Sequence, residues 1–235
     1  MDDETEILPD ADAVALYAAT WLTARAEAAE RFTVALSGGS TPKRLYGLLA
    51  KAPFRDRFPW ARTHLFFGDE RFVPPDHPDS NYRMANEAMI AHVPIPPGQV
   101  HRWPTEGDPA DAAKAYALML RDHYGAGGLD PGRPLFDVQF LGLGEDGHTA
   151  SLFPGVAALQ EREAWTAAVI GAKPEPRLTL TYPALNSSAE AVFLVAGEGK
   201  RAILARARRH DPALPASHVA PVGRLRWFVD AAAAG

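Results

Sequence analysis

The stretch FDVQFLGLGEDGHTASLFPG, at residues 136–155, carries the strongest information about how this chain folds. Its first six residues, 136–141, are mostly apolar, and such a continuous run is typical of a strand buried in a parallel sheet. Gly142, Gly144 and Gly147 follow with the spacing G-x-G-x-x-G. After a strand, that spacing is compatible with a turn that binds a dinucleotide, because glycines let the backbone approach a pyrophosphate.

The residues after these glycines argue against a dinucleotide site. That fingerprint leads directly into a helix, whereas Pro154 would end a helix here within two turns. The acidic residues about 20 positions further on, Glu161 and Glu163, lie in a polar segment and not at a strand end. Asp146 and His148 favour a catalytic loop instead, since a neutral imidazole can take a proton from water. The alternative is a structural turn, in which Asp146 bonds to its own backbone and His148 is a packed loop residue.

Strands and helices alternate along the rest of the chain. Apolar periodicity predicts helices over residues 13–29, 42–50, 80–91, 109–124 and 198–209, and strands over 32–36, 63–67, 165–170, 178–181, 191–196 and 225–229. This alternation predicts an α/β fold with a mostly parallel sheet flanked by helices, a Rossmann-like arrangement of three layers. Residues 1–235 show no linker or repeat, so we expect a single domain.

Ligands of such sheets bind outside the carboxyl ends of the strands. Four predicted loops lie there, at residues 37–41, 68–72, 142–149 and 197–200.

Composition excludes several classes of function. The chain is 47% hydrophobic and 23% charged, as in an ordinary globular protein, and its net charge of −5 makes nucleic acid an unexpected partner. No apolar run approaches the roughly 18 residues of a membrane span. Without cysteine the chain has no disulfides and no cysteine-based zinc site. The acidic start MDDETEIL differs from a signal peptide, so we expect a cytoplasmic protein.

The turn formed by Ser37, Gly38, Gly39, Ser40 and Thr41 predicts an anion site. Its glycines allow backbone N–H groups to approach a ligand, and the N-terminus of the following helix adds unpaired donors. The Gly-Lys-Ser/Thr ending of a nucleoside triphosphate loop is missing, so a monophosphate fits better. The alternative is a plain turn in which Ser40 or Thr41 caps the helix, with Pro42 at its first position.

Two cations could complete a phosphate site. The guanidinium of Arg71 could bind two phosphate oxygens, or it could form a surface salt bridge with Asp69 or Glu70. Lys200, in the Gly-Glu-Gly-Lys turn at 197–200, could reach a phosphate as a point charge, or it could be solvated in the first turn of a helix.

None of the other histidines lies in a glycine-rich loop beside a carboxylate, as His148 does. His64, His92 and His123 fit strands or helices, and His77 lies between Asp76 and Asp79 in a proline-flanked surface loop. We therefore expect no metal and no cofactor.

Five motifs together are similar to those of a known family. They are SGGSTP at 37–42, DERFVPPDHPDSNY at 69–82, LGLGEDGHTASLFPG at 141–155, RLTLTYPALN at 177–186 and GEGK at 197–200. In this order, and over essentially the whole length, the chain resembles 6-phosphogluconolactonases, and RLRWFVDAAA at 224–233 resembles their C-terminal strand. His218 departs from the Arg or Gln expected at its position.

This resemblance implies hydrolysis of 6-phospho-D-glucono-1,5-lactone to 6-phosphogluconate in the oxidative pentose phosphate pathway, by a monomer on a sugar-phosphate isomerase/deaminase-like fold. The related glucosamine-6-phosphate deaminases share two motifs, but they resemble Asp-Glu-Tyr where this chain has Asp69-Glu70-Arg71. They also continue the Asp-Gly-His loop with Ile-Ala-Phe-Asn-Glu, where this chain has TASLF at 149–153. Both differences favour the lactonase.

The expected mechanism assigns one role to each loop. His148 acts as the general base on water, and Asp146 orients it, fixes the loop or takes part directly. The residues expected to bind substrate are Ser37, Gly38, Gly39, Ser40, Thr41, Asp69, Arg71, Gly144 and Lys200. A serine nucleophile is less attractive because no Gly-x-Ser-x-Gly elbow is present. The alternatives are a deaminase and a non-catalytic sugar-phosphate sensor, and a role for Arg177 in binding substrate stays open.

Overall fold

The computed structural model describes residues 4–235, so the first three residues of the acidic start lie outside the described residues. Six parallel strands form the central sheet: β1 (Glu4–Leu8), β2 (Phe32–Leu36), β3 (Thr63–Phe67), β5 (Phe136–Leu141), β8 (Ser188–Val195) and β9 (Arg224–Asp230). Their order in the sheet is β1-β9-β8-β5-β2-β3. The predicted α/β fold with a mostly parallel sheet is confirmed, and β1 is a strand that apolar periodicity did not indicate.

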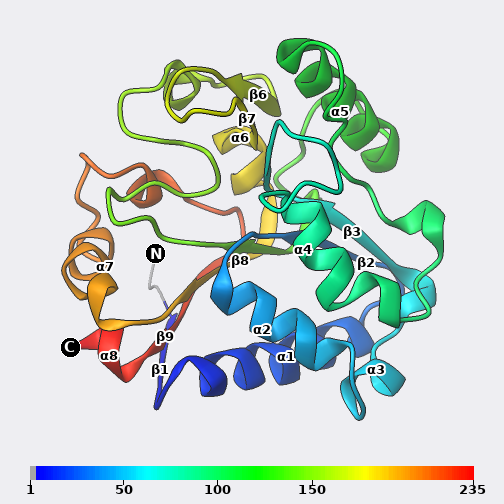
Figure 1. Cartoon of the computed structure of the whole chain (residues 1–235), viewed down its shortest axis with the longest axis vertical. Helices are drawn as coiled ribbons and strands as arrows, with labels where there is room; N and C mark the ends of the chain where they lie inside the picture. Colours follow the sequence, from blue (N-terminus) through cyan, green and yellow to red (C-terminus); the bar gives the residue numbers. More distant parts are fainter. Residues whose placement is uncertain (1–3) are drawn as a thin grey trace.

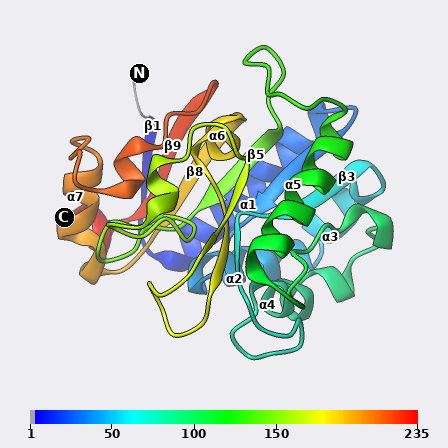
Figure 2. The same cartoon turned by 90° about the horizontal axis from the view of Figure 1, so that it is seen from above.

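Helices cover both faces of this sheet. They are α1 (Ala11–Ala28), α2 (Ser40–Leu49), α3 (Phe54–Arg57), α4 (Asn81–Ala88), α5 (Pro109–Tyr124), α6 (Tyr182–Asn186), α7 (Arg201–Ala207) and α8 (Ala231–Ala234). Figure 1 shows α1 and α2 below the sheet and α5 and α6 above it. Seen from above in Figure 2, α7 lies at the end near β1 and β9, and α3 and α5 lie at the end near β3. No helix of residues 4–235 is long and apolar enough to cross a membrane.

Capping residues explain where the two longest helices begin and end. Asp10 accepts a hydrogen bond of 2.8 Å from the Ala13 backbone N–H at the start of α1. Asp108 does the same for Ala110 and Asp111 at the start of α5, which ends at Gly125 with a left-handed φ of 75°. The helix expected over residues 198–209 is shorter, because a 3-10 turn over Glu198–Lys200 precedes α7.

Two of the predicted strands lie in a second, small sheet and not in the central parallel sheet. The strands predicted at 165–170 and 178–181 are β6 (Thr166–Val169) and β7 (Arg177–Leu180), and they do not join the central sheet. They form an antiparallel sheet of order β4-β7-β6 with β4 (Asp69–Arg71), which lies inside the expected loop 68–72. The reason is the connection: residues 170–176 are too short for a parallel crossover, which needs about a dozen residues or more.

Candidate active site

Four loops meet at the carboxyl edge of the central sheet. Strands β8, β5, β2 and β3 are neighbours in that order, so the loops that follow them emerge side by side. Together they line a cavity of about 290 Å³. Its lining includes every residue expected to bind substrate, together with His148: Ser37, Gly38, Gly39, Ser40, Thr41, Asp69, Arg71, Gly144, His148 and Lys200. Residues from loops up to 163 positions apart therefore face one small space.

Asp146 does not line the cavity but holds His148, which does. The two groups are joined by a hydrogen bond of 2.5 Å between His148 Nδ1 and Asp146 Oδ1. A carboxylate can only accept, so Nδ1 carries the proton and Nε2 keeps a lone pair for the cavity. The same carboxylate oxygen accepts from the His148 backbone N–H at 3.1 Å. The structural turn therefore coexists with a hydrogen-bonded Asp146–His148 pair, so the turn does not exclude a role for His148 at the cavity.

The charge state of Asp146 suits this arrangement. Burial raises the pKa of its carboxyl group, but the hydrogen bonds from His148 outweigh that effect and lower the pKa below its ordinary value. The carboxylate is therefore ionised at neutral pH and favours the tautomer with the proton on Nδ1.

Two of the three spaced glycines make room for the catalytic loop. A Cβ atom at Gly144 would lie 2.0 Å from His148 Nδ1 and 2.7 Å from Asp146 Oδ1. Gly147 has a left-handed φ of +80°, and a Cβ there would lie 2.7 Å from Leu214 Cδ2. Gly144 is therefore needed for close packing around the imidazole, and Gly147 for close packing against Leu214.

In the turn at residues 37–41 the hydroxyl groups of Ser40 and Thr41 do not cap the helix, and the Ser37 hydroxyl donates to the Gly38 carbonyl at 3.2 Å. Gly39, with φ of 109°, takes the N-cap position of α2, and no side chain caps this helix. The alternative in which Ser40 or Thr41 caps the helix is therefore wrong, and Pro42 occupies the third helical position and not the first. The cap is free of side chains because Gly39 adopts a conformation that hydroxyl residues rarely take.

Buried side chains hold this turn from two directions. The Tyr46 hydroxyl donates to the Ser37 carbonyl at 2.8 Å and accepts from the Ser37 N–H at 3.0 Å. A Cβ atom at Gly38 would lie 2.1 Å from Asn81 Oδ1, so only glycine lets the turn pack against Asn81.

Asp69 is oriented by residues that sequence reasoning missed. Asn81 Nδ2 donates to the Asp69 carbonyl at 3.0 Å and to Asp69 Oδ1 at 3.3 Å. Ser151 Oγ donates to Asp69 Oδ2 at 2.7 Å. Asn81 and Ser151 stand within the quoted motifs, but only the packed structure brings them to one carboxylate.

Arg71 does not form the surface salt bridge considered as an alternative. Its Nη1 donates to the Asp79 carbonyl at 2.6 Å. The buried Glu70 carboxylate is occupied by the backbone N–H groups of Asn81 and Tyr82 at 2.7 and 2.8 Å, so it is not an ionic partner of the guanidinium. Arg71 therefore faces the cavity with its charge uncompensated by its acidic neighbours.

Arg177 lies beside Arg71 because the two residues are paired across β4 and β7. Burial and the proximity of Arg71 lower the pKa of Arg177. The antiparallel sheet thus concentrates positive charge beside the cavity.

Lys200 is brought to the cavity by a turn that a distant residue stabilises. The Gly197 N–H donates to both carboxylate oxygens of Asp230, at 3.0 and 2.9 Å. Asp230 is the last residue of β9, and its role could not be inferred from the chain near Lys200.

Comparison with known proteins gives the relatives of this chain. A family profile described as "Glucosamine-6-phosphate isomerases/6-phosphogluconolactonase" matches residues 9–227. A 6-phosphogluconolactonase from Nostoc sp. is 41% identical over 243 residues, covering 99% of this chain and 98% of the relative. That from Rattus norvegicus is 44% identical over 215 residues, covering 87% and 80%.

Solved structures of related proteins share the fold of this chain. A 6-phosphogluconolactonase from Thermotoga maritima superposes with a TM-score of 0.83 at 31% identity, covering 97% of this chain and 100% of that one. A monomeric glucosamine-6-phosphate deaminase shares the fold alone, with a TM-score of 0.81 at 19% identity over 98% of both chains. Because the family profile, these relatives and the fold agree, the chain belongs to the glucosamine-6-phosphate isomerase/6-phosphogluconolactonase family, and within it to the 6-phosphogluconolactonases, a class of lactone hydrolases.

Proposed function

We propose that this protein hydrolyses 6-phospho-D-glucono-1,5-lactone to 6-phospho-D-gluconate, the ring-opening step of the oxidative pentose phosphate pathway. One observation carries the proposal: His148, held by Asp146, lines one cavity together with the glycine-rich turn at residues 37–41 and two cations, Arg71 and Lys200. A general base and a phosphate anchor in one small space are what a phosphorylated lactone requires.

The phosphate end of the substrate binds at the turn of residues 37–41. The N-terminus of α2 offers backbone N–H groups and a partial positive charge. Arg71 and Lys200 add two full charges from the neighbouring loops. This local positive charge offsets the net charge of −5 that would otherwise repel a phosphate dianion.

The lactone carbonyl then meets a water held by His148. Nε2 takes a proton from this water as its oxygen attacks C1, and a tetrahedral intermediate forms. When the bond between C1 and the ring oxygen breaks, the protonated imidazole returns the proton to that oxygen. Asp146 holds the ring in the required tautomer and stabilises the transient imidazolium. Positioning and one acid/base group suffice for an activated ester, so the chemistry calls for no metal or cofactor.

The rate of lactone disappearance above the spontaneous background tests the chemical role. We expect His148→Gln to lower kcat by about two to four orders of magnitude, the usual contribution of a general base. His92→Gln, in the 3-10 turn Ile90–His92, serves as the matched control and should keep wild-type turnover. Near-normal kcat in a folded His148→Gln variant would overturn the proposal.

A comparison of two substrates tests the phosphate anchor. Arg71→Ala and Lys200→Ala should raise KM for the phosphorylated lactone and change turnover of unphosphorylated gluconolactone little, whereas Lys51→Ala, beyond the far end of α2, should change neither. If both variants still prefer the phosphorylated lactone over gluconolactone as strongly as the wild type does, the assignment of the phosphate anchor is refuted. Ammonia release from glucosamine 6-phosphate would indicate a deaminase, and tight binding without turnover would indicate a sensor.

We expect the protein to act as a monomer. We expect it to work in the cytoplasm, and sedimentation equilibrium would test the oligomeric state.

A further inference from the structure

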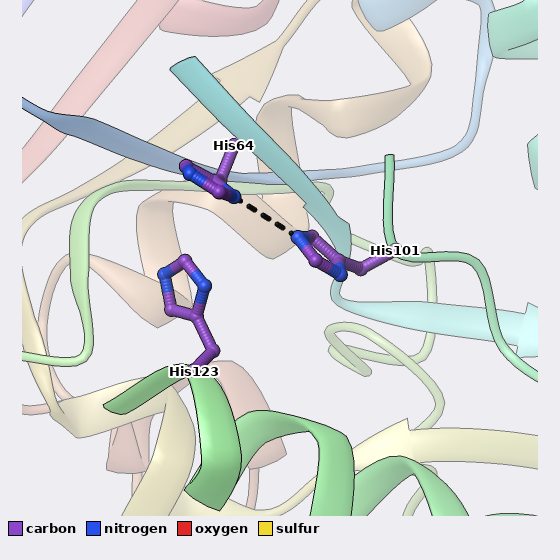
Figure 3. Close-up of side chains that lie close together, drawn as sticks. All are labelled: His64, His101 and His123. Carbon is purple, nitrogen blue, oxygen red and sulfur yellow. Dashed lines mark hydrogen bonds between the residues drawn. The ribbon is translucent and has the colours of Figure 1, made fainter. Parts of the chain in front are cut away.

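Three histidines far apart in the sequence converge (Figure 3), and none of them lines the cavity. His64 lies on β3, His123 lies in the last turn of α5, and His101 follows Val100, which is bridged to Leu65 of β3. Each ring offers one nitrogen, and these three nitrogens all lie within 4.8 Å of one another. The expectation that the histidines outside the catalytic loop are unrelated strand and helix residues missed this grouping.

The spacing of these rings suits a metal ion. A tetrahedral zinc ion with Zn–N bonds of about 2.0–2.1 Å holds its ligand nitrogens roughly 3.3 Å apart. His64 Nδ1 and His101 Nε2 are 3.1 Å apart, close to that value. A ring nitrogen of His123 lies within 4.8 Å of both, so the His123 ring must move toward them to complete the set. We propose that His64, His101 and His123 form a site for a divalent transition-metal ion of the zinc type.

The surroundings keep the rings in place and in the right protonation state. Phe66 stacks on His101 at 4.2 Å and contacts the edge of His123 at 4.7 Å, which restricts both rings. Burial, with the nearby His64 and Arg31, lowers the pKa of His101 to about 4. Burial and Arg31 lower the pKa of His123 to about 3. Neutral imidazole is the form that binds metals, and the C-terminus of α5 adds a partial negative charge.

Arg31 opposes the ion and so offers a distinctive test. Its Nη2 lies 3.0 Å from His123 Nδ1 and 3.2 Å from Nε2, where its charge would repel a cation. Arg31 is exposed, so its guanidinium can turn away toward solvent or toward the nearby Asp137. Burial raises the pKa of Asp137, and the charge of Arg31 partly offsets that effect. Removing Arg31 should therefore tighten metal binding.

The site differs from the catalytic cavity in ligand class and location. Imidazole donors select zinc, copper, nickel or cobalt over magnesium and calcium, which prefer oxygen ligands. His64 is the second residue of β3, whereas the catalytic loops leave the carboxyl ends of their strands. A bound ion would join β3, the segment at His101 and α5, and would not touch the lactone.

Isothermal titration calorimetry of metal-stripped, tag-free protein with zinc chloride tests this inference. We expect one ion per chain, weakened about tenfold or more in His101→Gln and His123→Gln, and tightened in Arg31→Ala. His92→Gln and His148→Gln should bind as the wild type does, which separates this site from surface histidines and from the catalytic pair.

Absence of saturable binding, or binding that His101→Gln and His123→Gln retain, would overturn the inference. If those variants do not fold by circular dichroism, the visible spectrum of the cobalt-loaded wild type decides: intense bands of a four-coordinate site support it, and the weak spectrum of hydrated cobalt refutes it. Lactone turnover enters none of these measurements, so failure here leaves the proposed function standing.

Discussion

Gly144 determines where the imidazole of His148 can lie. Its missing side chain leaves the space that His148 Nδ1 and Asp146 Oδ1 fill. Within the glycine pattern that resembles a dinucleotide turn, Gly144 thus has a different purpose, which is to let Asp146 and His148 fold back over their own backbone.

We predict that Gly144→Ala removes activity with little loss of stability. The added methyl group would lie 2.0 Å from His148 Nδ1, so the ring must leave its position, and a displacement of about 1 Å can cost about 100-fold in rate. Steady-state kinetics and thermal unfolding measure the two effects. Gly47→Ala is the matched control, because Gly47 lies in α2 with no atom within 4 Å of the new Cβ. A fully active Gly144→Ala variant would contradict the packing described for this loop.

The hydrogen bonds of Asp146 make part of the stability depend on pH. Burial raises the pKa of this carboxyl, but the hydrogen bonds from His148 lower it by more. The net pKa therefore lies below the ordinary value of 3.8. When the pKa of a carboxyl is lower in the folded chain than in the unfolded chain, the ionised carboxyl stabilises the fold at pH values above the unfolded-state pKa. This stabilisation is lost as the pH falls through the folded-state pKa.

Asp146→Asn should therefore unfold at a lower temperature than the wild type at pH 7, and this difference should shrink when both are measured below the ordinary value of 3.8. Thermal unfolding at several pH values provides the comparison. A difference that stays constant with pH would show that the charge of Asp146 is not involved.

Among the secondary-structure elements, the end of β9 controls the turn that carries Lys200. Asp230 caps α8 by accepting from the Ala233 N–H at 2.8 Å and also binds the Gly197 N–H. One carboxylate thus links the C-terminal helix to the turn that brings Lys200 to the cavity.

Asp230→Ala should lower the free energy of unfolding by about 1 kcal/mol, as for other lost helix caps, and should raise KM more than it lowers kcat. Urea unfolding and steady-state kinetics test both parts. Asp10→Ala, which removes the N-cap of α1, is the control: it should lose similar stability and keep its KM. If both variants keep their KM, Asp230 acts on stability alone.

Across the molecule, a buried ionic cluster joins one end of the central sheet to α1. Arg226 of β9 binds Glu190 of β8 at 2.7 Å and also pairs with Glu4 of β1. Arg25 of α1 reaches Glu190 at 2.9 Å. Arg226 and Glu190 are both buried, so each depends on the other to offset its desolvation.

We predict that Arg226→Ala lowers the free energy of unfolding by about 3 kcal/mol, because it leaves a buried carboxylate with one partner fewer. Arg224→Ala, which removes an exposed pair with Glu4, should cost only about 0–1 kcal/mol. Guanidinium unfolding of both variants gives the comparison, and equal losses would argue against a special role for the buried cluster.

Local signals in the chain were enough to predict much of this fold and its chemistry. The strand at 136–141, the helix at 109–124 and the ends of that helix follow from apolar periodicity and from Asp108 and Gly125. Asp146 and His148 are two residues apart, so their contact is also encoded locally. Such features depend on backbone preferences and near neighbours, which a single segment of sequence contains.

Packing of the whole chain was needed for everything that joins distant segments. The pairing of β4 with β7, the hold of Asn81 on Asp69, the contact of Asp230 with Gly197 and the histidine cluster link residues 12 to about 110 positions apart. These contacts depend on which strands lie next to each other and how the helices cover them. That order follows from burying all the apolar faces in one core at once, a condition that no local stretch of this chain expresses.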